Sequence, residues 1–453
     1  MFHPASLIAL LSHRRPLLLQ GPMGPFFARF AGFLETHDQQ VRKVHFNGGD
    51  QIFYGREGAT AYTGTLQAWP EWLARHIAAH RIDAVVLFGQ SRPIHAAARK
   101  VASRLGVAVY VFEEGYLRPD YVTLEHGGVN AYSRLPRHET YYAERPARDL
   151  SAPQPTRQRF HVMACYAGVY FLAMLLGSAR YRWHVYHRPI NPAVHAACWL
   201  RGGWRKLLYG WADRNRLAAL AAPERSRRWF LFPLQVHNDA QLLHHSRYHD
   251  MEAAIAEVLA SFAAHADSHA QLVVKHHPMD RAYTDYRRFI DAQTVQHGLA
   301  GRVLYVHDLH LPTLLKHARG VVTVNSTTGL QALFHGTPVH TLGDCLYALP
   351  GLVHTRTLDA FWTAPGQVDQ SLYARFRHHL VTHTQLNASF HGRSPALATP
   401  RLLARAEGAA SSLAARVARA PAAGAPRGEA AGFLPLHGLA VHMPIQPPAD
   451  LVG

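Results

Sequence analysis

Short apolar runs that end in polar residues recur along the first third of the chain. They are Pro16–Gln20, Val41–Phe46, Ile82–Phe88 and Val107–Phe112, and an apolar stripe at helical spacing over Leu66–Ala79 lies between two of them. Buried strands of a parallel sheet typically show such runs, and strands that alternate with helices form a doubly wound sheet. The pattern therefore predicts an α/β domain.

The same pattern returns in the second half of the chain. Apolar runs at 228–235, 271–275, 303–306 and 320–324 are predicted strands, and Met251–His265 and Leu311–His317 are predicted helices between them. A chain of 453 residues is long enough for two sizeable cores. We therefore expect a second α/β domain.

The stretch between the two regions differs from both. Residues 143–157 hold prolines, arginines and alanines without periodicity, whereas Phe160–Tyr209 predicts two helices rich in apolar and aromatic residues with arginine and tryptophan at their edges. Such helices are typical of the surface of a membrane. An ordinary helical hairpin that bridges two domains gives the same pattern and is the slightly favoured interpretation.

The domain boundaries follow from these changes in pattern. We expect an N-terminal domain at 1–142, a connector at 143–225 and a C-terminal domain at 226–400. From about residue 396 the chain is rich in Ala, Arg, Pro and Gly. A surface helix is predicted at 403–418, and 420–453 lacks the apolar content to order itself, so 401–453 is expected to be a partly disordered tail.

The charge favours anionic partners. The formal net charge is +17 and the pI is near 10.1, which suits nucleic acid, acidic lipid headgroups or substrates that carry phosphate. No nucleic-acid-binding module is recognisable, so nucleic acid is the weaker choice and is not expected as a partner.

The cysteines and the apolar segments indicate a cytoplasmic protein. The chain has three cysteines, Cys165, Cys198 and Cys345, which lie far apart in the sequence. An odd number of distant cysteines argues against a disulfide framework and fits a reducing compartment. The first residues lack the features of a secretory signal. The most apolar window, Val162–Gly177, is shorter than a comfortable membrane span.

Two adjacent carboxylates follow the strand predicted at Val107–Phe112. Ligands of open α/β sheets bind beyond the carboxyl ends of strands, and Glu113 and Glu114 repel each other unless a cation or a reaction needs them. Capping of the next helix, or pairing with Arg118, is an alternative of equal weight. The strand ends Gly21–Pro22 and Gly89–Arg92 are expected to line the same crevice.

Polar residues also follow the strands of the second half. Asn325-Ser326-Thr327 lies between a strand and a helix, where hydroxyl and N–H groups cap the helix or bind phosphate. His277-Pro278, with Lys275 before it, is a turn or a group that neutralises a leaving phosphate. Taken together, the two halves predict a two-domain nucleotide-sugar transferase, with the nucleotide on the C-terminal half and the acceptor on the N-terminal half.

Several short motifs are distributed over both halves of the chain. They are Gln20-Gly-Pro-Met-Gly-Pro-Phe26, Phe46-Asn-Gly-Gly-Asp50, Phe88-Gly-Gln-Ser-Arg-Pro93, Val111-Phe-Glu-Glu-Gly-Tyr-Leu-Arg-Pro119, Gly128-Val-Asn130, Lys275-His-His-Pro278, Val324-Asn-Ser-Thr-Thr-Gly329 and Gly336-Thr-Pro338. Over roughly residues 14–355 these motifs resemble those of the KpsS/LipB family of bacterial capsule polysaccharide biosynthesis and export proteins.

The resemblance implies a GT-B-like α/β fold, with two Rossmann-like domains facing a cleft and a helical connector. It implies a retaining β-Kdo transferase that moves Kdo from CMP-Kdo to a (lyso)phosphatidylglycerol-type lipid and begins the poly-Kdo linker for capsule export. The implied partners are the nucleotide-sugar donor, the phospholipid acceptor, the inner face of the cytoplasmic membrane, a second Kdo transferase and the capsule ABC transporter. The alternative is a non-catalytic export or assembly factor that binds the Kdo-lipid.

The resemblance also implies roles for residues. Glu114 is the expected nucleophile and Glu113 its supporting acid, although some relatives have Asp-Gly where this chain has Glu-Gly. The expected donor site is His277, Pro278, Asn325, Ser326, Thr327 and Lys275, and the expected substrate-binding residues are Gly21, Gly24, Gln90, Arg92 and Arg118. Arg92 and Arg118 either pair with the carboxylate of Kdo or brace the two glutamates. No Asp-x-Asp motif is present, so we expect neither a metal nor a cofactor.

Overall fold

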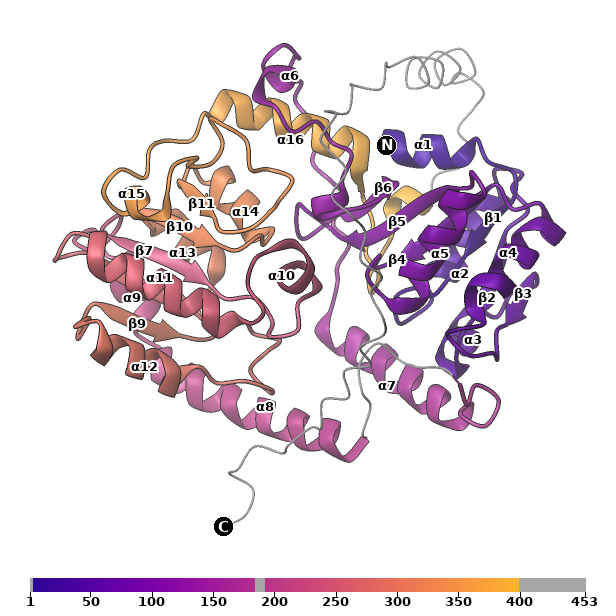
Figure 1. Cartoon of the computed structure of the whole chain (residues 1–453), viewed down its shortest axis with the longest axis horizontal. Helices are drawn as coiled ribbons and strands as arrows, with labels where there is room; N and C mark the ends of the chain where they lie inside the picture. Colours follow the sequence, from indigo (N-terminus) through magenta and orange to yellow (C-terminus); the bar gives the residue numbers. More distant parts are fainter. Residues whose placement is uncertain (1–2, 184–191, 399–453) are drawn as a thin grey trace, which may run out of the picture. The chain divides into compact units, whose positions relative to one another are not determined.

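A computed structural model describes residues 3–183 and 192–398 as helices around two β-sheets (Figure 1). One sheet has seven strands in the order β12-β6-β5-β4-β1-β2-β3, and the other has five in the order β11-β10-β7-β8-β9. The helix expected at 403–418 and the tail expected at 420–453 lie outside the described residues.

The seven-stranded sheet has a parallel part and an antiparallel edge. Strands β1 to β5 are parallel, whereas β6 pairs antiparallel with both β5 and β12. The order β3-β2-β1-β4-β5 is that of a Rossmann half, with its switch point between β1 and β4. The strands are β1 (Pro16–Leu18), β2 (Arg42–His45), β3 (Ala59–Ala61), β4 (Ala84–Phe88), β5 (Ala108–Glu114), β6 (Val122–His126) and β12 (Gln385–Leu386).

The helices of this part cover both faces of the sheet. Buried residues of α4 and α5 belong to the core on one face, and those of α1 and α2 to the core on the other. The helices are α1 (Ala5–Leu11), α2 (Phe26–Glu35), α3 (Gly48–Tyr54), α4 (Trp69–His80), α5 (Pro93–Arg104) and α6 (Glu139–Ala143).

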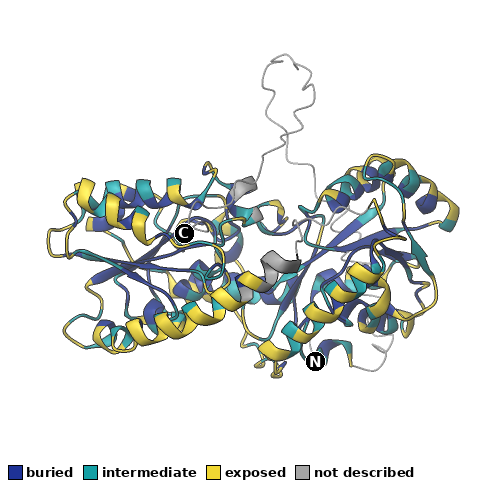
Figure 2. Cartoon of the chain, turned by 90° about the horizontal axis from the view of Figure 1, so that it is seen from below, coloured by how far each residue is buried: buried dark blue, intermediate teal, exposed yellow. Residues whose placement is uncertain are grey.

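The five-stranded sheet is parallel throughout and repeats the same strand order about its own switch point, between β7 and β10. Its strands are β7 (Trp229–Pro233), β8 (Gln271–Lys275), β9 (Val303–Val306), β10 (Gly320–Thr323) and β11 (Val339–Thr341). Its helices are α9 (Arg216–Ala221), α10 (Ala240–His245), α11 (Met251–His265), α12 (Arg287–Gln296), α13 (Leu311–His317), α14 (Thr328–Phe334) and α15 (Leu358–Thr363). The last helix, α16 (Gln370–Thr384), packs against α14 and also against α1, α6, β6 and β12. Strands of both sheets are buried and the outer sides of the helices are exposed (Figure 2).

These two sheets confirm the α/β class of two Rossmann-like domains, and one local expectation changes. Strand β5, expected to end at Phe112, continues through Glu113 and Glu114 because they pair with Thr123 and Val122 of β6. Helix α3 begins soon after β2, because the side chain of Asn47 accepts a hydrogen bond from the N–H of Asp50 and caps the helix.

The long helices expected between the domains are present. α7 (Phe160–Leu176) packs against α3, where Gly48 and Gly49 leave room for Ala173 and Tyr170. α8 (Pro192–Asp213) is bonded to the loop that follows β8. The expected domain limits stay predictions, and we note that β12 comes from the range assigned to the C-terminal domain yet pairs with β6. In the two described ranges, no helix has both the length and the apolar character that crossing a membrane requires.

Candidate functional site

A glutamine and an arginine meet at the switch point of the seven-stranded sheet. Gln20 follows β1 and Arg92 follows β4, and Arg92 Nη1 donates to Gln20 Oε1 at 2.9 Å and to the carbonyl of Gly21 at 3.4 Å. The guanidinium also lies 5.0 Å from the centre of the Phe88 ring. The expectation that the ends of β1 and β4 lie together is confirmed by these contacts.

A buried polar network continues from Gln20. Its amide donates to the hydroxyl of Tyr170 and to Asp50, and that hydroxyl donates to Asp50 Oδ1 at 3.0 Å. The amide of Asn47 donates to the same hydroxyl at 2.9 Å. Burial lowers the pKa of Lys43 to about 8, and the charge of Asp50 opposes this shift. The network fixes the side chains around the first switch point.

Glu113 and Glu114 lie at the end of β5 on opposite faces of the sheet, because side chains alternate along a strand. Glu113 is on the side of Val111, whose core includes α4 and α5, and Glu114 is on the side of Phe112, whose core includes α1 and α2. The two carboxylates therefore have different surroundings.

Burial raises the pKa of Glu113 to about 7, and the charge of Glu114 adds to the rise. A hydrogen bond from the N–H of Glu114 and the charge of Arg92 act in the opposite direction. At neutral pH Glu113 is therefore partly protonated and can donate a proton, as the sequence-based role of supporting acid requires.

A second buried carboxyl shares the face of Glu113. Glu125 accepts hydrogen bonds from the hydroxyl groups of Tyr116 at 2.6 Å and Ser133 at 2.5 Å. Burial raises its pKa to about 7, and these hydrogen bonds moderate the shift. The Tyr116 hydroxyl in turn accepts the N–H of Asn130 at 2.6 Å. Glu125 thus holds the loop beside β5 in place. The sequence does not indicate this role, because Glu125 is a single acidic residue in a run of alternating apolar and polar residues.

Three of the expected substrate-binding residues have partners within the chain. A Cβ on Gly21 would lie 2.8 Å from the ring of Phe27, and Gly24, with φ +114°, faces Tyr166. Gln90 exchanges two hydrogen bonds with the backbone of Val129, at 2.9 and 3.0 Å. The glycines make room for aromatic rings of the chain itself, and Gln90 fixes the loop that contains Val129.

Arg118 is exposed, and its Nε donates to the carbonyl of Gly115 at 3.4 Å. A side chain at Gly115 would collide with the carbonyl of Tyr121, so only glycine fits directly after Glu114. No ion pair between Arg118 and either glutamate occurs among the described residues.

A glutamine also spans the switch point of the five-stranded sheet. The side-chain amide of Gln235, just after β7, donates from Nε2 to Asn325 Oδ1 at 3.0 Å, and its Oε1 accepts the backbone N–H of Asn325 at 3.2 Å. The Asn325 amide donates to the carbonyls of Gln241 and His245. Asn325, expected to bind the donor, thus uses its side chain to join β7, β10 and α10.

The other expected donor residues divide into two groups. Lys275 is buried, donates to the carbonyl of His276 at 3.2 Å, and has a pKa lowered by burial to about 8. Ser326 and Thr327 are partly exposed beside α14, and the hydroxyl of Ser326 donates to that of Thr328 at 3.1 Å. Ser326 and Thr327 are therefore only partly covered by the rest of the chain.

His277 lies at the same carboxyl edge, with the exposed Pro278 after it. Its Nδ1 accepts the N–H of Met279 at 3.2 Å, so the proton of the neutral ring is on Nε2. Burial lowers the pKa of His277 to about 4, and the charge of Lys275 adds to this shift. His277 is therefore a neutral hydrogen-bond donor at physiological pH, in place of the cation that its position in the sequence led us to expect.

A histidine–carboxylate pair beside His277 was not among the expected residues. Asp280 is fully buried and accepts the ring Nδ1–H and the backbone N–H of His237, as well as the hydroxyl of Thr284. Burial opposes ionisation of Asp280, but these hydrogen bonds outweigh it and hold the pKa below its usual value. His237 directly follows the region of β7, so the strand-end argument would have found it.

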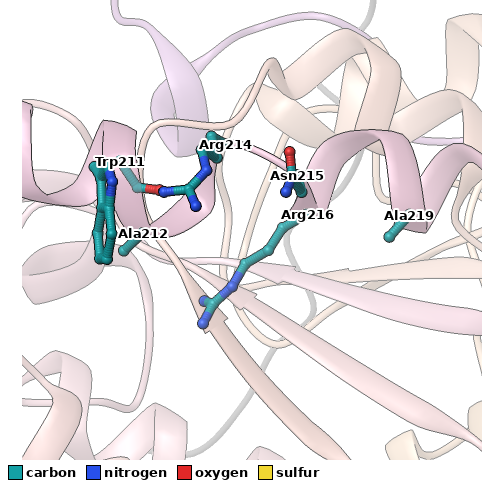
Figure 3. A pocket seen from close by; sticks show the side chains of 6 residues that line it. All are labelled: Trp211, Ala212, Arg214, Asn215, Arg216 and Ala219. Atoms are coloured by element: carbon teal, nitrogen blue, oxygen red, sulfur yellow. The ribbon is translucent and has the colours of Figure 1, made fainter.

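A surface cavity at the junction of α8 and α9 contains none of these residues. It is lined by Trp211, Ala212, Arg214, Asn215, Arg216 and Ala219 (Figure 3). Arg216 is used within the fold, since it binds Asp213 and donates to the carbonyl of Tyr305 at 2.8 Å. Across residues 3–183 and 192–398, no cluster of three or more His, Cys, Asp or Glu side chains has the arrangement to hold a metal ion.

A family model and two sequence relatives point to one family. The model of the family described as "Capsule polysaccharide biosynthesis protein" matches residues 83–391. The capsule polysaccharide export protein KpsS of Escherichia coli is 40% identical over 85% of this chain and 99% of its own length. The capsule polysaccharide modification protein LipB of Neisseria meningitidis serogroup B is 37% identical over 83% of this chain and 91% of its own length. A solved structure of Thermosulfurimonas dismutans KpsC, a beta Kdo 2,7 transferase, aligns with a TM-score of 0.40 and 16% identity, over 84% of this chain and 95% of that chain.

Proposed function

Because this chain belongs to the capsule polysaccharide biosynthesis protein family, we propose that it is a retaining glycosyltransferase that moves Kdo from CMP-Kdo to a (lyso)phosphatidylglycerol-type lipid. The observation that carries the proposal is the pair Glu113 and Glu114 at the carboxyl end of β5. Two carboxyl groups in different surroundings, one of them with a pKa near 7, are what retaining glycosyl transfer uses.

The proposed chemistry has two displacements. The carboxylate of Glu114 attacks the anomeric carbon of Kdo, the bond from that carbon to the CMP phosphate breaks with the electron pair leaving on CMP, and protonated Glu113 gives its proton to the departing phosphate oxygen. A hydroxyl of the lipid then attacks the same carbon, Glu114 leaves as a carboxylate, and the hydroxyl proton passes to the ionised Glu113. Each displacement inverts the carbon, so the overall configuration is retained.

The proposed donor site follows from the five-stranded sheet. His277 donates its Nε2–H to the CMP phosphate, and the hydroxyl groups of Ser326 and Thr327 donate beside it. Asn325, Lys275 and Gln235 hold the surrounding backbone in place. The departing CMP carries a single phosphate, so we propose that the reaction needs no metal ion. Arg92 is available at the first switch point to bind the carboxylate of Kdo.

The test is transfer by the purified full chain. Incubation with CMP-Kdo and a fluorescent lyso-phosphatidylglycerol is expected to release CMP and to give a Kdo-lipid in equal amount, with no loss of rate in EDTA. Folded protein that releases no CMP and forms no Kdo-lipid would refute the proposal. Since the acceptor is a membrane lipid, we place the reaction at the inner face of the cytoplasmic membrane, in a pathway with a second Kdo transferase and an ABC transporter.

A second candidate function is favoured by the export label of the E. coli relative. In that case the protein binds a finished Kdo-lipid and passes it on without catalysis. Such a carrier has no use for the nucleotide, so CMP binding that weakens in His277→Ala favours the transferase, and the absence of any CMP binding favours the carrier.

A further inference from the structure

Helix α8 places its arginines toward the protein. Arg201 donates to the carbonyl of Ala282, with Nε at 2.7 Å, and Arg205 donates to the carbonyls of Arg281 and Thr284. Tyr209 stacks on His307 with ring centres 3.6 Å apart. These residues are spaced by four, so they define one side of the helix, and this inner side is polar.

The outer side of α8 is apolar. Its largest exposed side chains are Leu200, Trp204, Leu207 and Trp211, which are 78%, 63%, 70% and 70% exposed. Their spacing of four, three and four residues places them on one stripe. A helix on the surface of a soluble domain has the reverse arrangement, with apolar residues inward. We refer to these four residues as the α8 stripe.

The surroundings of the α8 stripe identify the kind of partner that it fits. Arg214 lies over the ring of Trp211, with its Cζ 4.6 Å from the ring centre, and the two side chains are neighbours in Figure 3. Lys206 is exposed next to Leu207. Tryptophan and leucine bordered by cations are typical of helices that lie at the boundary between acyl chains and anionic headgroups. The net charge of +17 also favours an anionic surface over a second copy of this chain.

We propose that the α8 stripe inserts into the surface of an anionic phospholipid bilayer, with Lys206 and Arg214 at the level of the headgroup phosphates. For its biological setting the inference rests on the proposed function, which it deepens by assigning a surface through which the protein meets the membrane. α7 carries an exposed apolar patch of its own, made of Val169, Leu172, Leu175 and Leu176.

Flotation of the full chain with lipid vesicles tests the proposal. The wild type is expected to float with vesicles of phosphatidylcholine and phosphatidylglycerol, less with phosphatidylcholine alone, and less at high salt. The double variant Trp204→Glu/Leu207→Glu is expected to lower the partition coefficient at least about tenfold, because both charges would enter the apolar layer. Leu105→Glu, an exposed leucine next to α5, is the matched control and is expected to float like the wild type.

A second measurement separates this inference from the proposed function. CMP binding, measured by calorimetry in the absence of lipid, is expected to be unchanged in the double variant, which also reports that it folds. Should the glutamate variant misfold, Leu207→Gln provides the same comparison. Flotation of the double variant at the level of the wild type would overturn the proposal. So would a wild-type dimer that the variant converts to monomer with no vesicle binding by either, since a second copy would then cover the stripe.

Discussion

The carboxyl groups of Glu113 and Glu114, adjacent in β5, lie on opposite faces of the seven-stranded sheet. Each therefore has its own environment, and burial raises the pKa of Glu113 to about 7. A nucleophile must be ionised and an acid must be protonated, so two neighbours with the same chemistry can serve different roles only if their surroundings differ. Successive side chains of a strand point to opposite faces of the sheet, and this gives Glu113 and Glu114 their different surroundings.

Glu114→Gln is expected to lower Kdo transfer by at least about a thousandfold, because the amide cannot form the glycosyl ester. Its affinity for CMP is expected to equal that of the wild type, since the donor residues belong to the other sheet. Steady-state CMP release and calorimetry measure the two quantities. Transfer at a rate near that of the wild type would assign the nucleophile elsewhere.

Glu113→Gln tests the acid through the dependence of rate on pH. Since the carboxyl must be protonated to act, wild-type transfer is expected to fall as the pH rises through about 7. The variant is expected to be slower by about a hundredfold and to lose that step. Glu125 is present in both proteins. If the transfer rate of the variant still falls by the same factor near pH 7, the group that titrates is Glu125 and not Glu113.

The same substitution has a consequence for stability. A carboxyl whose pKa is raised in the folded state stabilises the fold below its unfolded pKa, and this contribution is lost as the pH rises toward about 7. Glu113→Gln is therefore expected to be more stable than the wild type by about 2 kcal/mol near pH 8, with a smaller difference near pH 5. Urea unfolding at the two pH values measures the change.

His277→Ala is expected to weaken CMP binding by about tenfold, because one hydrogen bond to a phosphate is lost. With a pKa near 4 the ring is neutral above about pH 5, so the ratio of wild-type to variant affinity is expected to stay constant from about pH 5.5 to 8. A ratio that falls through about pH 6.5 would show that the bound ring is a cation. His269→Ala, at an exposed site before β8, is the control.

Tyr170→Phe is expected to lower the free energy of unfolding by about 2 kcal/mol, because the buried carboxylate of Asp50 loses a donor while Asn47 and Gln20 each lose one acceptor. Tyr166→Phe, one turn earlier in α7, is the matched control and is expected to change stability by less than about 0.5 kcal/mol. Equal effects of the two changes would argue against a stabilising role for the network.

The sequence was sufficient for the elements that local patterns define. Strands β1, β2, β4, β5, β7, β8, β9 and β10 and the helices at Met251–His265 and Leu311–His317 were predicted because apolar runs and helical stripes are visible without tertiary context, whereas β3, β6 and β11 were not. The end of β5 was not predicted, because its pairing with β6 carries the strand past the last apolar residue. The two-residue strand β12 has no pattern of its own and exists only through that edge.

The candidate site shows the same limit. Arg92 and His277 were identified from the sequence because each follows a predicted strand. The carboxyl ends of parallel strands meet at one edge of the sheet, where ligands bind. The partners of Gln90 and Asn325 are backbone groups of distant segments, so their structural roles could not be inferred from spacing. The neutral state of His277 also depends on burial, which residue type does not reveal.

Because β12 pairs with β6, a fragment of this protein contains the whole seven-stranded sheet only if it includes Gln385 and Leu386. The seven-stranded sheet begins near residue 16 and receives its last strand at Gln385–Leu386, after every strand of the five-stranded sheet has been synthesised. A fragment cut after residue 142 would leave the outer edge of β6 without a partner and would remove Asn387, whose amide donates to the carbonyl of Asp120 at 2.8 Å. During translation, therefore, the half of the protein that is made first is the half that is finished last.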